Sequence, residues 1–261
     1  MKQPSSFFSR IVVSVLVVPI ATLILGEAFT HLYNVTLDAG LLARAGFTFQ
    51  KPLIFGLAGV MQIVLIASIR AVLAPIFRYL RAPDAADEAL YAKARKAALG
   101  VPWTLILVTV GFWTMGTIVF YALNDWKSPG GTPLVWVLSF KITEGLLSAT
   151  LNALIINILL LEPKRRLNMV HIRDGERDRF AEARDIITMV ATVGAFIAHL
   201  SYVARYFILR SPTARGPINP VLSLILVGGV LGAIAVGMVV LSRREDRLQA
   251  EALRRRIRDL G

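Results

Sequence analysis

The stretch VLSLILVGGVLGAIAVGMVVL, residues 221–241, contains no charged side chain, and the charged stretch SRREDR follows it directly at residues 242–247. A helix needs about 20 apolar residues to cross the hydrocarbon core of a bilayer, which is about 30 Å thick. This stretch meets that requirement, and the abrupt change to charged residues marks a membrane boundary. The sequence here therefore predicts a membrane-spanning helix that ends in water.

The rest of the chain has the same character. Of its 261 residues, 56% are hydrophobic and 18% are charged, and the mean hydropathy is +0.63. Soluble domains average about 45–50% apolar and about 25% charged residues. The sequence therefore predicts an all-α polytopic membrane protein built as a six-helix bundle. The predicted spans lie near residues 8–33, 53–77, 102–124, 133–161, 185–209 and 220–242.

The basic residues indicate which ends of these helices face the cytoplasm. Of the 29 Lys and Arg residues, 22 fall on one side of the predicted spans, together with both chain ends. Because cytoplasmic loops carry the excess of Lys and Arg, we expect both termini to be cytoplasmic and the protein to lie in a cell inner membrane. This placement accounts for the net charge of +12 without a nucleic acid, and the lipid bilayer is the first predicted partner.

The chain divides into a predicted transmembrane domain, residues 1–242, and a cytoplasmic helix, residues 243–261. Four apolar residues of this helix have the spacing of a and d positions in a coiled coil, which favours a homodimer. They are Ala250, Leu253, Ile257 and Leu260. The alternative is a basic amphipathic helix that lies on anionic lipid. Two heptads alone leave both interpretations open.

The sixth predicted span contains small residues at three- and four-residue spacing. Such residues let helix backbones approach closely in a bilayer, where lipid supplies no hydrophobic driving force between helices. The candidate packing residues are Gly228, Gly229, Gly232, Ala233 and Gly237. They predict either a dimer face or close packing inside one bundle.

Polar residues follow one face of the fourth predicted span. Lys141, Glu144, Ser148 and Asn152 share this face, because their offsets of 3, 7 and 11 residues follow the helical repeat. A charge at bilayer depth costs at least about 2.5 kcal/mol and is a functional hypothesis by default. Lys141 and Glu144 can also neutralise each other at i,i+3 spacing. The stripe therefore predicts either an internal ion pair or a ligand, ion or signalling site.

Other polar residues reach a similar depth on neighbouring helices. Together they predict a cluster made of Glu27, His31, Lys141, Glu144 and His199. Histidine changes charge near neutral pH, so this cluster suits the sensing of pH or of a small ligand. No metal site is predicted, because no two His residues have the close spacing of a zinc-binding helix, and the chain has no Cys.

The two basic linkers resemble each other and suggest a duplicated unit. LAPIFR at 73–78 ends the second predicted span, and LEPKRR at 161–166 ends the fourth. The motifs YAKAR at 91–95 and FAEAR at 180–184 follow at matching distances and lead into the next spans. Membrane proteins are often built from such repeats. We expect each unit to contain a helix, a basic elbow, a short amphipathic cytoplasmic helix and a second spanning helix.

The six spans, the basic helix that runs into Pro102-Trp103 and the LEPKRR ending resemble one known module. It is the six-helix N-terminal membrane domain of bacterial receptor cyclases, in which a HAMP domain and a class III adenylate or guanylate cyclase domain follow. The resemblance implies a membrane input or anchoring domain whose sixth helix passes a signal to a cytoplasmic effector. Residues 1–261 lack the metal-binding carboxylates and base-reading residues of a cyclase, so no catalytic residue, cofactor or enzyme activity is carried over.

Three functions remain open from the sequence. The first is the sensor or anchoring domain that the resemblance implies. The second is a small transporter or channel that uses the polar face of the fourth span, and the third is an accessory structural subunit of a membrane complex. They differ in what they require of the fourth span and of residues 243–261.

Overall fold

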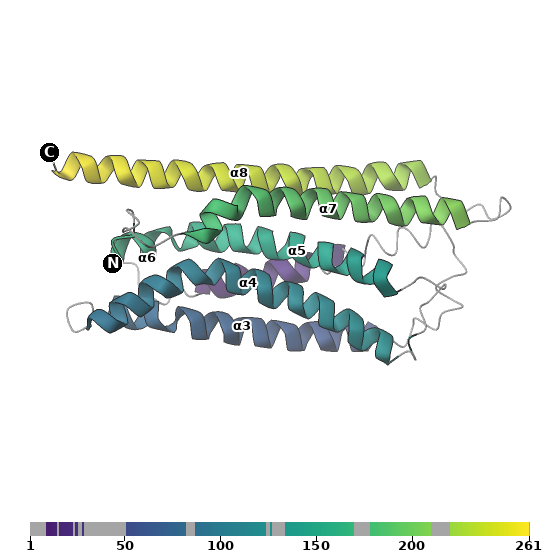
Figure 1. The fold of residues 1–261 in the computed structure, drawn as a ribbon, viewed down its shortest axis with the longest axis horizontal. Helices are drawn as coiled ribbons and strands as arrows, with labels where there is room; N and C mark the ends of the chain where they lie inside the picture. Colours follow the sequence, from purple (N-terminus) through teal and green to yellow (C-terminus); the bar gives the residue numbers. More distant parts are fainter. Residues whose placement is uncertain are drawn as a thin grey trace.

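A computed structural model describes residues 9–14, 16–22, 24–25, 28, 51–81, 87–123, 126, 134–169, 178–209 and 220–260. Every regular element in these ranges is a helix, and the long helices run side by side (Figure 1). The helices are α3 (Lys51–Arg81), α4 (Glu88–Ala122), α5 (Leu134–Leu159), α6 (Leu161–Arg166), α7 (Arg179–Leu209) and α8 (Pro220–Leu260). The all-α architecture expected from the sequence is therefore confirmed for the described ranges.

Five helices in the described ranges are long and apolar enough to cross a membrane. The spanning segments are Gly59–Arg81, Glu88–Val119, Val137–Leu159, Arg179–Ser201 and Ile225–Glu251. The predicted span near residues 8–33 is helical where it is described, over parts of Ser9–Thr22, and much of its second half lies outside the described residues. Five of the six predicted spans are thus found.

The helices extend further on the predicted cytoplasmic side than the spans alone. α4 begins at Glu88 and passes through Pro102, so its basic, alanine-rich first part is continuous with the membrane segment. The separate cytoplasmic helix expected before the third span does not occur. Alanine, lysine and arginine are strong helix formers, and a cap at Asp87, whose Oδ1 accepts the Leu90 N–H at 2.6 Å, sets the start instead.

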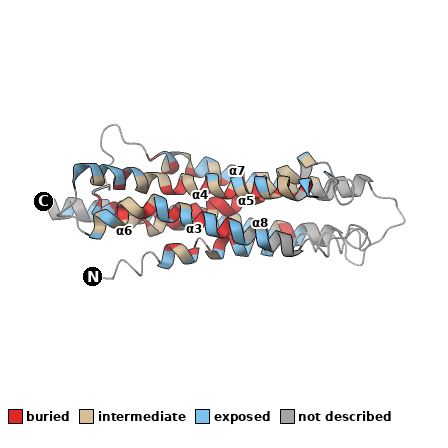
Figure 2. Cartoon of the chain, turned by 90° about the horizontal axis from the view of Figure 1, so that it is seen from below, coloured by how far each residue is buried: buried red, intermediate tan, exposed pale blue. Residues whose placement is uncertain are grey.

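The helix packing places α5 at the centre and α8 at the edge. Within the spanning segments, 61% of α5 but only 22% of α8 is buried. Figure 2 shows buried residues concentrated where the helices face each other. The large apolar side chains exposed on α3, α7 and α8 suit contact with lipid, which explains why the outer faces carry few charges.

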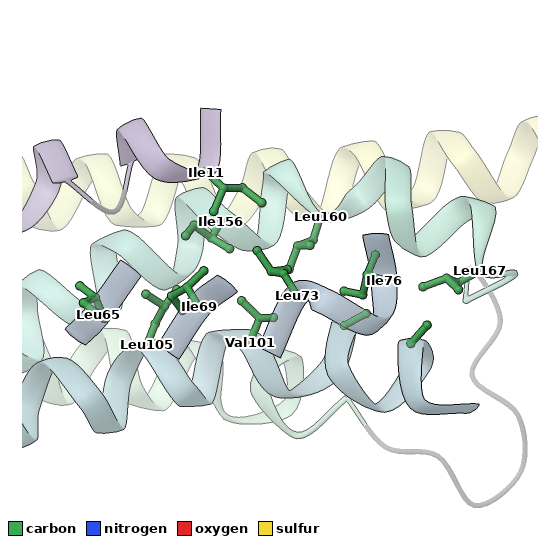
Figure 3. Close-up of a cluster of buried hydrophobic side chains, with 12 residues drawn as sticks. Ile11, Leu65, Ile69, Leu73, Ile76, Val101, Leu105, Ile156, Leu160 and Leu167 are labelled. Carbon is green, nitrogen blue, oxygen red and sulfur yellow. The ribbon is translucent and has the colours of Figure 1, made fainter. Parts of the chain in front are cut away.

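Two hydrophobic clusters hold the helices together. One joins α3, α4 and the end of α5, where Leu65, Leu73, Leu105 and Ile156 are fully buried (Figure 3). The other joins α5, α7 and α8. It contains four buried alanines, Ala149, Ala153, Ala191 and Ala195. These small side chains let α5 and α7 pack closely, as small residues do between membrane helices.

Among the described glycines, Gly145 has the least space around it, where α5 packs on α4. A Cβ atom at this glycine would lie 2.8 Å from the Cβ and Cγ atoms of Trp113 and 2.9 Å from its Cδ1 atom. The Trp113 side chain therefore packs directly on the α5 backbone. Only glycine leaves room for this contact.

We predict that Gly145→Ala destabilises the bundle, because the new methyl group overlaps a bulky ring close to its attachment point. Overpacking of this kind costs about 1–3 kcal/mol. The control is Gly111→Ala on α4, where a Cβ would meet nothing within 4 Å and where alanine favours the helix. Thermal unfolding in detergent should show a lower Tm for Gly145→Ala alone. Equal Tm values for the two variants would contradict the close crossing.

Candidate functional site: two polar layers in the bundle

The first polar layer begins with the charged pair of α5. Lys141 Nζ donates to Glu144 Oε2 at 2.8 Å, and the two side chains are 22% and 9% exposed. The Lys141 ammonium also lies 5.4 Å from the ring centre of Trp113 and 5.3 Å from that of Phe140. Aromatic faces attract cations. The expected ion pair is therefore formed, and two rings surround its ammonium.

His199 of α7 lies in the same region. It is 2% exposed, and its ring packs edge-on against Phe140 with 4.5 Å between ring centres. Phe140 thus links His199 to the charged pair. Glu27 and His31 lie outside the described residues, so the structure brings together three of the five residues predicted for this cluster.

The rest of the α5 stripe faces the N-terminal helical segment. The hydroxyls of Thr22 and Ser148 are 2.7 Å apart, and Ser14 Oγ donates to Asn152 Oδ1 at 3.0 Å. Both α5 side chains are fully buried. Side-chain hydrogen bonds of this kind join helices inside a bilayer. This part of the stripe therefore serves helix association.

A second polar layer lies at the predicted cytoplasmic end. Lys164 of α6 donates to Asn157 Oδ1 at 2.8 Å and to Asp178 Oδ2 at 3.0 Å. Asp178 stands just before α7, and its Oδ1 also accepts the Ala181 N–H at 3.1 Å, which caps that helix. One lysine thus ties the end of α5 to the start of α7.

The same layer extends to α8. Glu245 is completely buried and accepts hydrogen bonds from the side-chain amides of Asn157 and Gln249. Arg184 of α7 lies 3.5 Å from the Glu245 carboxylate and 2.9 Å from that of Asp246. We call Asn157, Lys164, Asp178, Arg184, Glu245 and Asp246 the cytoplasmic polar network. It connects α5, α6, α7 and α8.

The four buried charges of this network balance one another. Lys164 and Arg184 are cationic, Asp178 and Glu245 are anionic, and each of these four side chains is at most 10% exposed. Removing one member of such a buried set is costly, because it leaves an uncompensated charge. The network therefore fixes the positions of its helices relative to one another.

A related contact joins the two halves of the bundle. Arg95 is 3% exposed and donates to the Leu167 carbonyl at 2.7 Å, while the Tyr91 hydroxyl donates to the same oxygen at 2.9 Å. Arg95 and Arg184 end the two matching sequence motifs. Arg95 donates to a backbone carbonyl just after α6, whereas Arg184 pairs with side-chain carboxylates of α8, so the two matching motifs place their arginines in different kinds of contact.

The candidate packing residues of α8 lie mostly away from the bundle. A Cβ at Gly228 would lie 3.7 Å from the Phe196 ring, whereas one at Gly229, Gly232 or Gly237 would meet nothing within 4 Å, and Ala233 is exposed. Among the described residues, the bundle does not use these three glycines for close packing.

The predicted coiled-coil residues all belong to α8. Ala250 is exposed. Leu253, Ile257 and Leu260 lie in the same helix, and their side chains are outside the described residues. Their pairing stays a prediction.

The cytoplasmic polar network was absent from the sequence analysis. Glu245 occurs in the stretch SRREDR, which has the composition of a solvated helix face. One indication was present, because Asn157 and Lys164 are seven residues apart and so share a helix face. The partner of Asn157 on α8, Glu245, is 88 residues away and becomes visible only once the helices are packed.

Within the described ranges, no group of three His, Asp or Glu side chains gathers as a metal site needs. Comparison with known proteins finds no matching family model, curated protein or solved structure. The two polar layers therefore have to be interpreted from their own geometry.

We predict that Lys141→Met lowers the Tm more than the double variant Lys141→Met with Glu144→Leu. The single change leaves the Glu144 carboxylate in the bundle without its ion pair, while the double change removes both charges. Thermal unfolding of the three proteins in the same detergent measures this. An equal loss of stability in both variants would show that the pair contributes nothing.

Proposed function

We propose that the chain is an inner-membrane sensor or anchoring domain that passes a conformational signal through α8 to a cytoplasmic effector. The observation that carries this proposal is the continuity of α8. One helix of 41 residues contains both the apolar span and the charged stretch that follows it, and at 1.5 Å per residue it is about 60 Å long. This is about twice the thickness of the hydrocarbon core.

The packing supports a transmitting role for α8. Its membrane part lies at the edge of the bundle and is mostly exposed, so it is free to shift along its neighbours. At the cytoplasmic end, Glu245 and Asp246 attach it to Arg184 and Asn157. A rearrangement of α5 or α7 therefore acts on α8 where it leaves the membrane.

The exposed face of α8 supports a homodimer. Ile225, Gly229, Gly232, Val236 and Val239 are all exposed and follow one another at alternating intervals of four and three residues. The same register passes through two charged residues, Arg243 and Asp246, of which Asp246 pairs with Arg184. It then reaches the predicted coiled-coil positions, which begin at Ala250. Such a heptad repeat is the pattern of helices that pair side by side. The exposed residues from 225 to 239 thus offer a stripe to a second copy, and the predicted coiled-coil positions from Ala250 follow in the same register.

The proposed orientation places both termini in the cytoplasm and follows from the distribution of Lys and Arg. Seven of these residues lie beyond residue 242. The resemblance to the membrane domain of receptor cyclases agrees with this orientation and gives the class of effector, a cytoplasmic domain joined to the sixth helix.

The other functions have less support. A transporter needs an open polar path along α5. Ser148 and Asn152 instead form hydrogen bonds with the N-terminal segment, and Lys141 forms an ion pair with Glu144. An accessory subunit needs no continuous output helix. We therefore place the sensor or anchoring domain first.

Single cysteines test the dimer and the orientation together, because the natural chain has none. In inside-out vesicles, an impermeant thiol crosslinker should join copies with cysteine at Leu253 or Ile257 more than copies with cysteine at Arg254 or Arg255, which flank the a and d positions. Right-side-out vesicles should give no crosslink.

Equal yields at the four positions would contradict pairing through the stripe. Crosslinks in right-side-out vesicles would contradict the proposed orientation. In either case the accessory-subunit function moves ahead of the sensor.

A further inference from the structure

The cytoplasmic polar network attaches α8 through an arginine that faces two consecutive carboxylates. We propose that Arg184 is the pivot of a latch that sets the rotational position of α8 about its own axis. This inference rests on the proposed role of α8 as the output helix. The latch would explain how one rotational position of α8 is selected over another.

The geometry of Arg184 provides two alternative partners on α8. Its Nη1 lies 2.9 Å from Asp246 Oδ1 and 3.5 Å from Glu245 Oε2, and its Nη2 donates to Asp246 Oδ2 at 3.2 Å. The structure therefore holds the guanidinium mainly on Asp246. Consecutive residues of an α-helix point about 100° apart. A rotation of α8 through part of that angle moves Asp246 away from Arg184 and brings Glu245 into its place.

Both positions keep the buried charges paired. When Arg184 binds Asp246, the Glu245 carboxylate still accepts the amides of Asn157 and Gln249. When Arg184 binds Glu245, Asp246 has water available, because its side chain is already 45% exposed. Neither arrangement leaves a lone charge in a buried position, which is the costly case. Two arrangements of similar energy are what a conformational switch requires.

The remaining charged groups around Arg184 are compatible with both positions. Asp185 belongs to α7, like Arg184, and its Oδ1 lies 3.2 Å from the guanidinium Nε. Its side chain is 78% exposed. Lys164 and Asp178 pair with each other at 3.0 Å, and Lys164 is hydrogen-bonded to Asn157, which in turn donates to Glu245. These contacts hold Arg184 and the α6 elbow in place while α8 turns.

Rotation at this point changes which face of α8 meets the cytoplasm. Asp246 lies one helical turn before Ala250, the first of the predicted coiled-coil positions. Because α8 continues without interruption to Leu260, a turn at residues 245–246 reorients the stripe that follows. The latch thus converts a movement of α7 into a rotation of α8, which changes the direction that its coiled-coil positions face.

The test measures a distance within one chain in lipid nanodiscs. Spin labels on cysteines replacing Glu182 of α7 and Arg247 of α8, both exposed and outside the network, report the rotation by pulsed electron resonance. Asp246→Asn leaves Glu245 as the carboxylate of α8 that faces Arg184, and Glu245→Gln leaves Asp246. Asp246→Asn should shift the mean distance, whereas Glu245→Gln should keep the wild-type value, because Arg184 of the natural chain already lies mainly on Asp246. A rotation of about 30° moves a side-chain end by about 3 Å.

The matched control is Glu162→Gln on α6, which removes an exposed carboxylate that contacts Arg166 at 3.1 Å and should leave the distance unchanged. A wild-type distance in Asp246→Asn, or the same shift in both network variants, overturns the latch and leaves the network a static brace. If Glu245→Gln does not fold, Asp246→Asn alone decides, because an unchanged distance contradicts the pivot. A chain in which Asp246→Asn shifts the distance but which never dimerises would refute the dimer and not the latch.

Discussion

The carboxylate of Glu245 is completely buried in the helix that otherwise packs least into the bundle. A buried charge without partners is too costly to persist, so α8 is stable in this position only because α5 and α7 bring Asn157 and Arg184 to it. This requirement fixes where α8 leaves the bundle. It also connects three helices that share little other polar contact.

The two polar layers have different roles because they lie at different depths. In the first polar layer, Lys141 and Glu144 neutralise each other within one helix. The pair therefore needs no charged partner from a neighbouring helix. In the cytoplasmic layer, every charged partner of Arg184 except Asp185 comes from α8. The first polar layer therefore stabilises α5 itself, and the second polar layer joins separate helices. When one helix moves relative to another, the contacts of the second layer change, whereas the Lys141–Glu144 pair within α5 is kept.

Hydropathy predicted the five spans that the structure contains, because the thickness of the bilayer strictly limits the length of each apolar run. The helix ends were less predictable. A composition boundary marks where lipid stops, whereas the start of α4 depends on a cap at Asp87. The i,i+3 pair of Lys141 and Glu144 was predictable for the same reason as the spans, since it is local. The bond between Asn157 and Glu245 depends on helix packing, which no local pattern reveals.

The glycines also show the difference between what a local sequence pattern predicts and what depends on helix packing. Small residues on α8 suggested tight packing, yet among the described glycines the one with the closest neighbour is Gly145 on α5, which faces Trp113. A single glycine in an apolar helix gives no indication of which ring will face it. Spacing rules identify faces of helices, and the partner of each face is decided by the fold.

The most direct test of the account is hydrogen exchange along α8 in lipid nanodiscs. If the cytoplasmic polar network clamps this helix, the backbone amides of residues 242–249 should exchange as slowly as those of the membrane segment. In Arg184→Gln, with its pivot lost, exchange in these residues should rise toward the rate of the chain end. Fast exchange over residues 242–249 in the natural protein, equal to that of residues 252–260, would contradict the central claim that buried charges fix α8 to the bundle.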